Sequence, residues 1–287
     1  MTLSVLLAHP TLQAVGSVSC YPGVGTIVPA LIPGIGVAVA QASGDSVLAN
    51  ALVQGLAGRT SPTEVLQQVV ASDDRREHRQ LAVVCAQSGR TASFTGRSVL
   101  PEASTVSRDH CIVTGNLLAS KSVVDAAAVG LGGAAGAFRP ETLVECLRAG
   151  LKAGGDARGT ISGSVSVSGR VDHLGHAFDV RQIDVRIDWS KQVGTALAHG
   201  LRQRLSYSLV EHLAYAPAQN RDVEALEMTA WHMAEAGPDA SAAVLLCAKV
   251  IDAGGDPGRG RRLAADIITK FPGPGANPAT MSALWGF

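Results

Sequence analysis

The sequence predicts an α+β fold, a four-layer αββα sandwich followed by an all-helical C-terminal extension. Three observations lead to this fold class. Strand patterns begin at the second residue and recur in pairs, stretches with helix-start and helix-stop signals separate the groups of strands, and strand patterns end at about residue 190. Strands and helices in this order are typical of stacked sheets with helices outside. We therefore expect the sandwich over residues 1–190 and the extension over residues 191–287.

The N-terminal part of the chain alternates short strand patterns with turn residues. The strands expected here lie at residues 2–8, 13–20, 28–30 and 34–41. His9-Pro10 separates the first two, which should form a hairpin. Residues 24–42 are apolar enough to suggest a membrane span, but Pro29, Pro33 and three glycines interrupt the run. This segment therefore fits two buried strands and a turn better.

Helix signals then separate further groups of strands. The expected helices lie at residues 47–55, 60–72, from 122 onwards and 140–153, and the expected strands at residues 81–85, 91–95, 111–114, 164–168 and 180–187. Ser61 followed by Glu64 is typical of a capping box, while Pro140 and Gly154-Gly155 mark a helix start and stop. A turn is expected at Gly169, and the alternation of the last strand is typical of a half-buried strand.

The C-terminal part shows Leu and Ala at helical spacing and no strand pattern. The expected helices lie at residues 192–213, 222–236, 240–253 and 258–270. Pro217, Gly237-Pro238 and the run 254–257 break them, and no period repeats convincingly. The Gly- and Pro-rich residues 272–278 lead to Trp285-Gly286-Phe287, an aromatic end that we expect to dock on the chain or on a partner subunit.

Composition limits the classes of function. Hydrophobic residues make up 46% of the 287 residues and aromatic residues only 4%, so the core must be built from Ala, Val, Leu and Ile. Lys and Arg together number 24, as do Asp and Glu, which argues against a dedicated nucleic-acid or acidic-membrane surface. We expect neither nucleic acid nor a membrane as a partner.

The spacing of cysteines and histidines indicates reduced thiols and no metal site. The five cysteines are odd in number, widely spaced and without a CxxC pair, which is typical of a cytosolic protein. No basic segment followed by an apolar core opens the chain, so we expect no secretory signal and a cytoplasmic location. The eight histidines have no metal-ligand spacing, and we expect no metal and no cofactor.

Thr2 follows the initiator methionine directly. Met1 is normally removed when a small residue follows, and the mature chain then begins with an α-amine and a hydroxyl on adjacent carbons. Because the amine titrates near neutrality, it can take the hydroxyl proton, so this residue combines nucleophile and base. Many proteins begin Met-Thr without any such role, and both interpretations stay open at this point.

An ordered set of short motifs runs through residues 1–190. The set comprises Met1-Thr2-Leu3-Ser4, Gly16-x-Val18, Gly23-Val24-Gly25 with Pro29, Gly34-x-Gly36, Gln41-Ala42, Arg79-Gln80, Thr95-Gly96, Gly115-Asn116-Leu117-Leu118-Ala119, Gly154-Gly155-Asp156-Ala157-Arg158-Gly159 with Ser162, and Asp184-Val185-Arg186-Ile187-Asp188. No single motif is specific, but the ordered set resembles the DUF1028 family. Proteins of that family are similar to N-terminal nucleophile (Ntn) hydrolases, so the resemblance implies the four-layer sandwich and a hydrolytic chemistry, without a substrate.

Two positions depart from the pattern of that family. Ala8-His9 stands where the family usually has Arg-Asp, and Tyr21-Pro22 stands where it usually has a bulkier, often aromatic stretch. These departures favour a changed entrance to the site, or a site without activity. The C-terminal helical segment lies outside the usual match.

On the Ntn hypothesis, the hydroxyl of Thr2 attacks an amide-like carbonyl. Gly115-Asn116 offers a backbone N–H and a side-chain amide to the oxyanion, although an ordinary strand-to-helix turn explains this pair equally well. Ser4 faces the same side of the strand as Thr2, where it either tunes the nucleophile or is a small core residue. The predicted catalytic residues are Thr2, Ser4 and Asn116.

The predicted substrate-binding residues lie at strand ends and in a glycine-flanked loop. Asp156 and Arg158 could pair with each other, orient the amine, or bind a substrate carboxylate through the planar fork of the arginine. A salt bridge in a surface turn is the alternative. Gln41, Arg79 and Gly115 complete this set of candidates.

The sequence therefore predicts an amidohydrolase that cleaves a small, non-peptide or cyclic amide and acts as a homo-oligomer. One alternative is an inactive or regulatory protein of the same fold whose helical extension mediates oligomer or partner binding. Another is a tailoring enzyme that makes or rearranges amide bonds. Cys20 as a rival nucleophile and Lys121 as a charge near the amine rank lower, because a buried thiol and a solvent-facing lysine explain them.

Overall fold

The structure is a computed structural model that describes residues 2–58, 60–131, 139–214, 223–236, 251 and 258–271. The chain divides into two compact units, residues 1–171 with 179–201 and residues 172–178 with 202–287. Antiparallel sheets combine with helices, which confirms the predicted α+β class. The predicted domain boundary at residue 190 stays a prediction.

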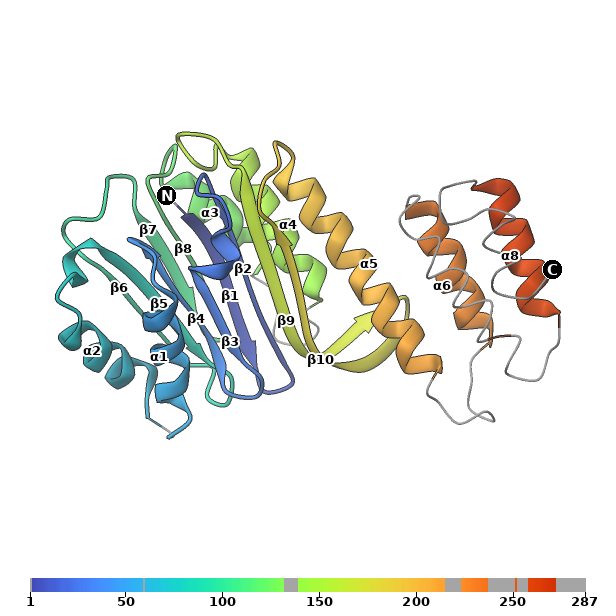
Figure 1. Cartoon of the computed structure of the whole chain (residues 1–287). Helices are drawn as coiled ribbons and strands as arrows, with labels where there is room; N and C mark the ends of the chain where they lie inside the picture. The colour runs from blue at the N-terminus through green and yellow to red at the C-terminus, as the bar shows by residue number, and fades with distance from the viewer. Residues whose placement is uncertain are drawn as a thin grey trace. The chain divides into compact units, whose positions relative to one another are not determined.

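The larger sheet has the N-terminal strand near its centre. Its strands are β1 (Thr2–His9), β2 (Leu12–Ser19), β7 (Ser104–Arg108), β8 (Cys111–Asn116), β9 (Ser162–His173) and β10 (His176–Ile187). They lie in the order β10-β9-β2-β1-β8-β7 (Figure 1). Because β1 pairs antiparallel with both β2 and β8, the predicted hairpin is confirmed and both edges of β1 are hydrogen-bonded.

The smaller sheet has four strands in chain order. These are β3 (Pro29–Ile32), β4 (Gly36–Ala42), β5 (Arg79–Cys85) and β6 (Thr91–Thr95). The short 3₁₀ helices η1 (Val24–Thr26) and η2 (Arg76–His78) precede β3 and β5. The apolar segment 24–42 therefore forms two strands joined by a turn, as predicted.

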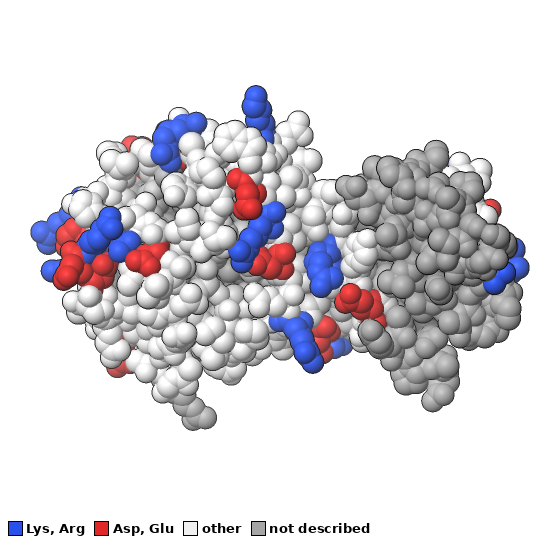
Figure 2. Space-filling view, viewed as in Figure 1, with Lys and Arg blue, Asp and Glu red and all other residues white. Residues whose placement is uncertain are grey.

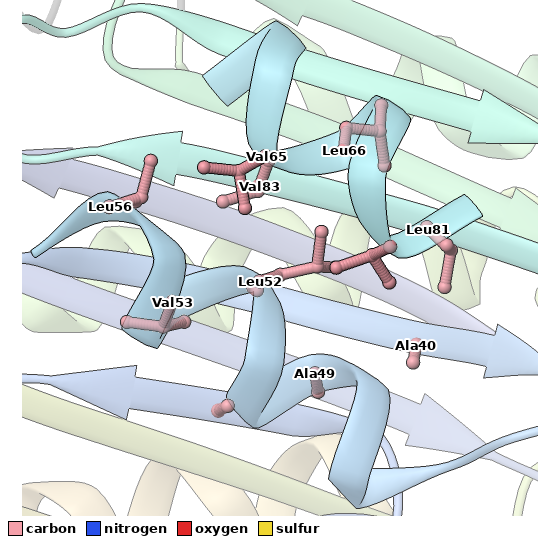
Figure 3. Close-up of a cluster of buried hydrophobic side chains, with 12 residues drawn as sticks. Ala40, Ala49, Leu52, Val53, Leu56, Val65, Leu66, Leu81 and Val83 are labelled. Atoms are coloured by element: carbon pink, nitrogen blue, oxygen red, sulfur yellow. The ribbon is translucent and has the colours of Figure 1, made fainter. Parts of the chain in front are cut away.

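Two helices pack on the outer face of the smaller sheet. In α1 (Ser46–Leu56) the carboxylate of Asp45 accepts a hydrogen bond from the backbone N–H of Val47, and in α2 (Pro62–Ser72) Ser61 and Glu64 form the predicted capping box. Figure 3 shows the apolar cluster between these helices and the strands, with Ala49, Leu52, Val53 and Leu56 from α1, Val65 and Leu66 from α2, and Ala40, Leu81 and Val83 from the sheet.

The opposite face of the smaller sheet meets the larger sheet. Successive residues of a strand point to opposite faces, so Ala38 and Ala40 of β4 face the helices while Val37 and Val39 face the other sheet. The buried cluster between the sheets consists of Leu6, Ala8, Val15, Val24, Val28, Val37, Val39, Ala82, Val84, Ala86 and Ile112. Side chains of both sheets therefore share one buried layer, which we call the inter-sheet layer.

The second face of the larger sheet carries α3 (Ser122–Val129) and α4 (Pro140–Lys152). Glycines allow this close packing: a Cβ on Gly16 would lie 2.4 Å from a methyl of Leu143, and one on Gly150 would lie 2.4 Å from a methyl of Leu3. Within the first unit, α1 and α2 thus pack on the smaller sheet, and α3 and α4 pack on the larger sheet.

The remaining described helices are α5 (Val193–Ala214), α6 (Val223–Ala236) and α8 (Arg259–Lys270), close to three of the predicted ranges. In the second unit Arg259 forms an ion pair with Glu227 at 2.6 Å, and the Lys270 ammonium lies 5.1 Å from the ring centroid of Trp231. These contacts join α6 to α8. The predicted helix 240–253, apart from Ile251, and the aromatic end of the chain lie outside the described residues.

The structure corrects two predictions about strands. β7 was not predicted, because its five residues (Ser104–Arg108) are mostly polar and form an edge strand. The turn predicted at Gly169 lies instead at Leu174-Gly175, and β9 continues through Gly169 to His173. Gly169 has a φ of 111°, and a Cβ there would lie 2.2 Å from the carbonyl oxygen of Thr11, so the glycine serves a close backbone approach.

Surface charge is mixed in sign. On the face in Figure 2, Lys and Arg side chains of the described residues lie in small groups beside Asp and Glu. Among the helices that the structure describes, none combines the length and the hydropathy of a membrane span. The predictions about nucleic acid, membranes and oligomers stay predictions.

Candidate functional site

Two rows of polar side chains cross the larger sheet where β1 begins. Register places Thr2 opposite Ser19 and Asn116, with Ser162 opposite Ser19. Two residues further along, Ser4 lies opposite Ser17 and Thr114, with Ser164 opposite Ser17. All eight side chains are buried. Directly paired residues share a face of a sheet, so these rows face the smaller sheet.

Three amide side chains connect these rows to the smaller sheet. Ser4 Oγ donates to Gln41 Oε1 at 2.7 Å, and Gln41 Nε2 donates to Gln80 Oε1 at 2.8 Å. Asn116 Nδ2 donates to the same Gln80 oxygen at 3.0 Å, and Gln80 Nε2 donates to the carbonyl of Gly115 at 3.0 Å. The amides thereby fix one another's orientation inside the protein.

Thr2 lies at the end of this network. Its side chain is 5% exposed, and Oγ1 donates to Ser19 Oγ at 3.5 Å, a long contact. Its main-chain oxygen accepts from Gln41 Nε2 at 3.3 Å. Ser19 Oγ also accepts from the backbone N–H of Tyr21 at 3.0 Å, which holds the partner hydroxyl in place. We call the set Thr2, Ser4, Ser17, Ser19, Gln41, Gln80, Thr114 and Asn116 the polar end of the inter-sheet layer.

Asp156 lies near the start of β1 and contacts the segments that follow its two neighbouring strands, β2 and β8. Its carboxylate accepts from the backbone N–H of Cys20 at 3.0 Å, and its backbone bridges to Leu118. Cys20 directly follows β2, and Leu118 lies two residues after β8. Asp156 therefore links the two segments on either side of β1, the strand that begins with Thr2. Arg158 donates to the Asp156 carboxylate from its backbone at 2.8 Å and from Nε at 3.2 Å.

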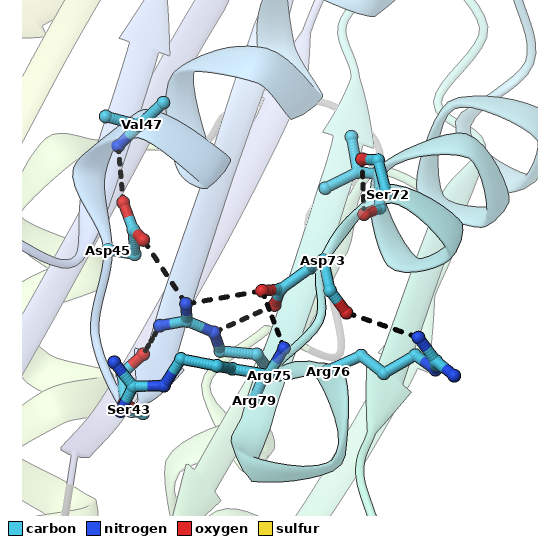
Figure 4. Close-up of polar contacts among 9 residues, drawn as sticks. Ser43, Asp45, Val47, Ser72, Asp73, Arg75, Arg76 and Arg79 are labelled. Carbon is cyan, nitrogen blue, oxygen red and sulfur yellow. Dashed lines mark hydrogen bonds and ion pairs between the residues drawn. The ribbon is translucent and has the colours of Figure 1, made fainter.

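Arg79 belongs to a different cluster. Its side chain points to the helix layer, where Nε donates to Asp73 at 2.9 Å, Nη2 lies 3.3 Å from Asp45, and Nη1 donates to the carbonyl of Ser43 (Figure 4). Burial raises the pKa of Asp73, but hydrogen bonds and the charge of Arg79 outweigh it and leave that pKa below its ordinary value. The structure does not bring Arg79 together with Thr2.

A pocket of about 420 Å³ opens beside Asn116. It is lined by Ala42, Ser43, Asp74, Arg75, His78, Ser98, Val99, Leu100 and Asn116. Ala42 and Leu117 directly follow two amides of the polar end and have φ values of 73° and 48°, which non-glycine residues rarely adopt. Such strained backbone is typical of functional sites.

The structure thus unites most of the predicted residues and adds others. Thr2, Ser4, Gln41, Gly115 and Asn116 come together, with Asp156 and Arg158 at the same end of the sheet. The residues that the sequence did not mark as site candidates are Ser17, Ser19, Gln80 and Thr114. Ser17 and Ser19 lie two positions apart at the end of β2, Thr114 lies two positions before Asn116 on β8, and Gln80 lies at the start of β5, so the signal is polar residues at the ends of strands that otherwise read as apolar.

Two buried cysteines, Cys111 and Cys146, are poor rival nucleophiles. Burial raises the pKa of the Cys146 thiol to about 11, and it also raises that of Cys111. Within the described ranges, no three His, Cys, Asp or Glu side chains group as a metal site requires.

A solved structure shares this fold. It is the crystal structure of protein SPO2555 from Silicibacter pomeroyi, which is assigned to the DUF1028 family. The TM-score is 0.62 at 24% identity, over 71% of this chain and 86% of that one. Anbu (ancestral beta-subunit) from Yersinia bercovieri has a TM-score of only 0.33 at 12% identity, over 75% of this chain and 98% of that one. No curated protein matches.

The first likeness establishes the fold and leaves the activity open. The family model that matches the chain is described as a family of unknown function, and the match covers residues 2–197, more than half of the chain. The protein therefore belongs to the DUF1028 family.

Proposed function

We propose that this protein is an N-terminal nucleophile amidohydrolase that cleaves a small, non-peptide or cyclic amide. Thr2, after removal of Met1, is the nucleophile. We also propose that the two sheets and their flanking helix pairs form the four-layer αββα sandwich of that class. The observation that carries the proposal is the register of β1, which holds the hydroxyl of Thr2 between Ser19 and Asn116 at the end of a buried polar network.

The cost of burying polar groups supports this assignment. An unpaired buried hydroxyl or amide costs roughly 1–3 kcal/mol, so a protein that only needs a core fills it with apolar side chains. Here eight polar side chains occupy one end of the inter-sheet layer, and Gln41, Gln80 and Asn116 use several of their hydrogen-bonding atoms on one another. A preorganised site is the simplest reason for such a network.

The reaction follows from the atoms at Thr2. Oγ1 attacks the carbonyl carbon, and its proton passes to the α-amine, which then delivers a proton to the leaving nitrogen as the C–N bond breaks. Water hydrolyses the resulting ester and restores Thr2. The oxyanion needs a donor, and Asn116 has a second amide hydrogen beyond the one that it gives to Gln80.

The other predicted residues receive separate roles. Ser4 holds Gln41, which in turn holds the main-chain oxygen of Thr2, so Ser4 positions the nucleophile. Asp156 lies where β1 begins and orients the amine by charge. Gly115 lies within β8 and its carbonyl is bonded to Gln80, so it supports the network. Arg79 has its own carboxylate partners, and we leave it out of the site.

The alternative is a regulatory protein of the same fold. The burial of Thr2 and its contact with Ser19 favour this alternative, because a substrate must reach the hydroxyl. An inactive protein would keep the network as a structural element, and the helical extension would bind the partner. The same site in a tailoring enzyme would transfer the acyl group to an amine instead of water.

Intact mass and covalent labelling test the proposal. The mature protein should lack Met1, and an epoxyketone, which bonds to both the amine and the hydroxyl of an N-terminal threonine, should label Thr2. Thr2→Ala should lose labelling and turnover, whereas Thr11→Ala, an exposed threonine of the first hairpin, should keep both. Retention of Met1, or turnover that survives Thr2→Ala, would overturn the mechanism.

A further inference from the structure

The pocket beside Asn116 is lined by an arginine, Arg75, whose guanidinium forms no ion pair in the part of the chain that the structure describes. Arg75 lines the pocket and is exposed, and its Nη2 donates to the hydroxyl of Ser43 at 3.0 Å, as Figure 4 shows. Its backbone N–H donates to Asp73 at 3.1 Å, which fixes the start of the side chain. Within the described residues, Arg75 forms no ion pair.

The other two arginines near the site are occupied. Arg158 meets both oxygens of Asp156, through Nε at 3.2 Å and Nη2 at 3.4 Å. Arg79 is buried between Asp73 and Asp45. A guanidinium already paired with carboxylates has fewer free N–H donors, and its charge is already balanced, so it attracts a further anion less strongly. Arg75 is therefore better suited to bind an anion than Arg158.

The rest of the pocket limits the ligand further. Val99 and Leu100 provide an apolar wall, and the Leu100 side chain is 58% exposed, so a ligand that covers it gains hydrophobic contact. Ser98 adds a hydroxyl, and Asp74 lines the same pocket and would repel a second negative charge. Asn116, the register partner of Thr2, also lines the pocket, so a ligand that contacts Asn116 lies on the side of the proposed nucleophile.

We propose that Arg75 determines specificity by binding a carboxylate of the substrate, and that the substrate class is an N-acyl amino acid or similar amide with one carboxylate and a medium-sized apolar group. The assignment of this ligand as a substrate rests on the proposed function. The pocket of about 420 Å³ is within the range of sites for molecules of this size.

Binding, measured apart from turnover, tests this inference. The probes are N-acetylleucine and its methyl ester, which differ by one negative charge, titrated by calorimetry into the Thr2→Ala variant so that nothing is consumed. N-acetylleucine should bind more tightly than the ester. Arg75→Gln should weaken N-acetylleucine about tenfold, since a charge-assisted hydrogen bond contributes more than the roughly 1.4 kcal/mol of one tenfold step.

A neighbouring arginine provides the matched control. Arg76 is exposed and does not line the pocket, so Arg76→Gln should leave both affinities unchanged. Arg75→Lys keeps the charge but loses the fork, and should restore part of the affinity. Equal binding of the acid and the ester, or an unchanged affinity in Arg75→Gln, would overturn the inference. If Arg75-dependent binding occurs while wild-type protein keeps Met1, the pocket stands and the proposed mechanism fails.

Discussion

The two ends of the inter-sheet layer are built by the same strands and differ in chemistry. On β1, the inward-facing residues change from Thr2 and Ser4 to Leu6 and Ala8. The inward-facing residues of three other strands change in the same way. Gln41 is replaced by Val39 two positions along β4, Gln80 by Ala82 on β5, and Thr114 by Ile112 on β8. On β1, β4, β5 and β8 the change from polar to apolar therefore falls at the same level. We call the group Leu6, Ala8, Val37, Val39, Ala82, Val84 and Ile112 the apolar end.

The apolar end stabilises the fold, whereas the polar end forms the proposed site. The apolar end gains free energy from burial in proportion to its area, whatever the detailed geometry. The polar end gains little net free energy from its hydrogen bonds and loses much if one partner is missing. Its geometry is consequently stricter than its contribution to stability requires, as expected for a site whose atoms must be held in place.

A polar side chain at this end does not by itself belong to the site. Arg79 and Gln80 are neighbours on β5, but they point to opposite faces of the sheet. Gln80 joins the polar end, and Arg79 ties Asp45 before α1 to Asp73 after α2. Substitutions along one strand should thus separate effects on stability from effects on Thr2.

The largest loss of stability is expected for Arg79→Met. Removing the guanidinium leaves the buried carboxylate of Asp73 with the backbone N–H of Arg75 but without its ion-pair partner, so the free energy of unfolding should fall by about 3–5 kcal/mol. Urea unfolding measures the loss. Adding Asp73→Asn should recover part of it, because the unpaired charge is then removed. A loss no larger than that of Arg76→Met, an exposed neighbour, would place Arg79 outside the structural core.

Leu6→Ala is expected to destabilise the apolar end by about 2–5 kcal/mol, because a fully buried side chain is replaced by a cavity. Labelling of Thr2 by an epoxyketone should keep its rate in the fraction that remains folded, since the polar end is untouched. Val47→Ala, at a side chain that is 73% exposed, is the control and should cost less than about 0.5 kcal/mol. A large change in labelling rate with Leu6→Ala would show that the two ends are coupled.

Ser4→Ala should cost about 1–3 kcal/mol, because Gln41 loses its donor and Ser17 loses its partner in the buried layer. It should also slow labelling of Thr2, since Gln41 then holds the main-chain oxygen of Thr2 less firmly. Ser168→Ala provides the comparison: Ser168 is buried in β9 and donates to the carbonyl of Arg181 at 2.5 Å. Similar losses of stability with equal labelling rates would make Ser4 a structural residue only.

Local patterns explain why so much of the fold was predictable. The hairpin of β1 and β2 and the capping box at Ser61 depend on residues close together in the sequence, and both are confirmed. The polar end needs more, because the bond between Gln41 and Ser4 joins different sheets across 37 positions of sequence. The local sequence does not show whether a strand-end arginine such as Arg79 faces a site or a helix pair. Its partners depend on how α1 and α2 pack on the sheet.

The smallest expected effect comes from a buried polar atom that lacks the partners found at the polar end. In the second unit, Nε2 of His232 is buried without a hydrogen-bond partner in the described part of the chain. Burial lowers the pKa of His232 below 6.5, and nearby His173 and Arg202 lower it further, while Glu235 acts in the opposite direction. The neutral ring is thus the form that fits the folded protein.

The sign of the pH dependence follows from this pKa. Below pH 6.5 the unfolded chain binds a proton that folded His232 does not, so the free energy of unfolding should decrease as the pH falls from 6.5 through the lower folded value. His232→Gln removes this titration and should flatten the change in melting temperature between pH 7.5 and 5.5. His199→Gln, an exposed position on α5, should leave the slope as in the wild type. If both variants keep the wild-type slope, His232 tolerates its proton in the folded state, and an unpartnered ring nitrogen there costs less than the polar end would lead us to expect.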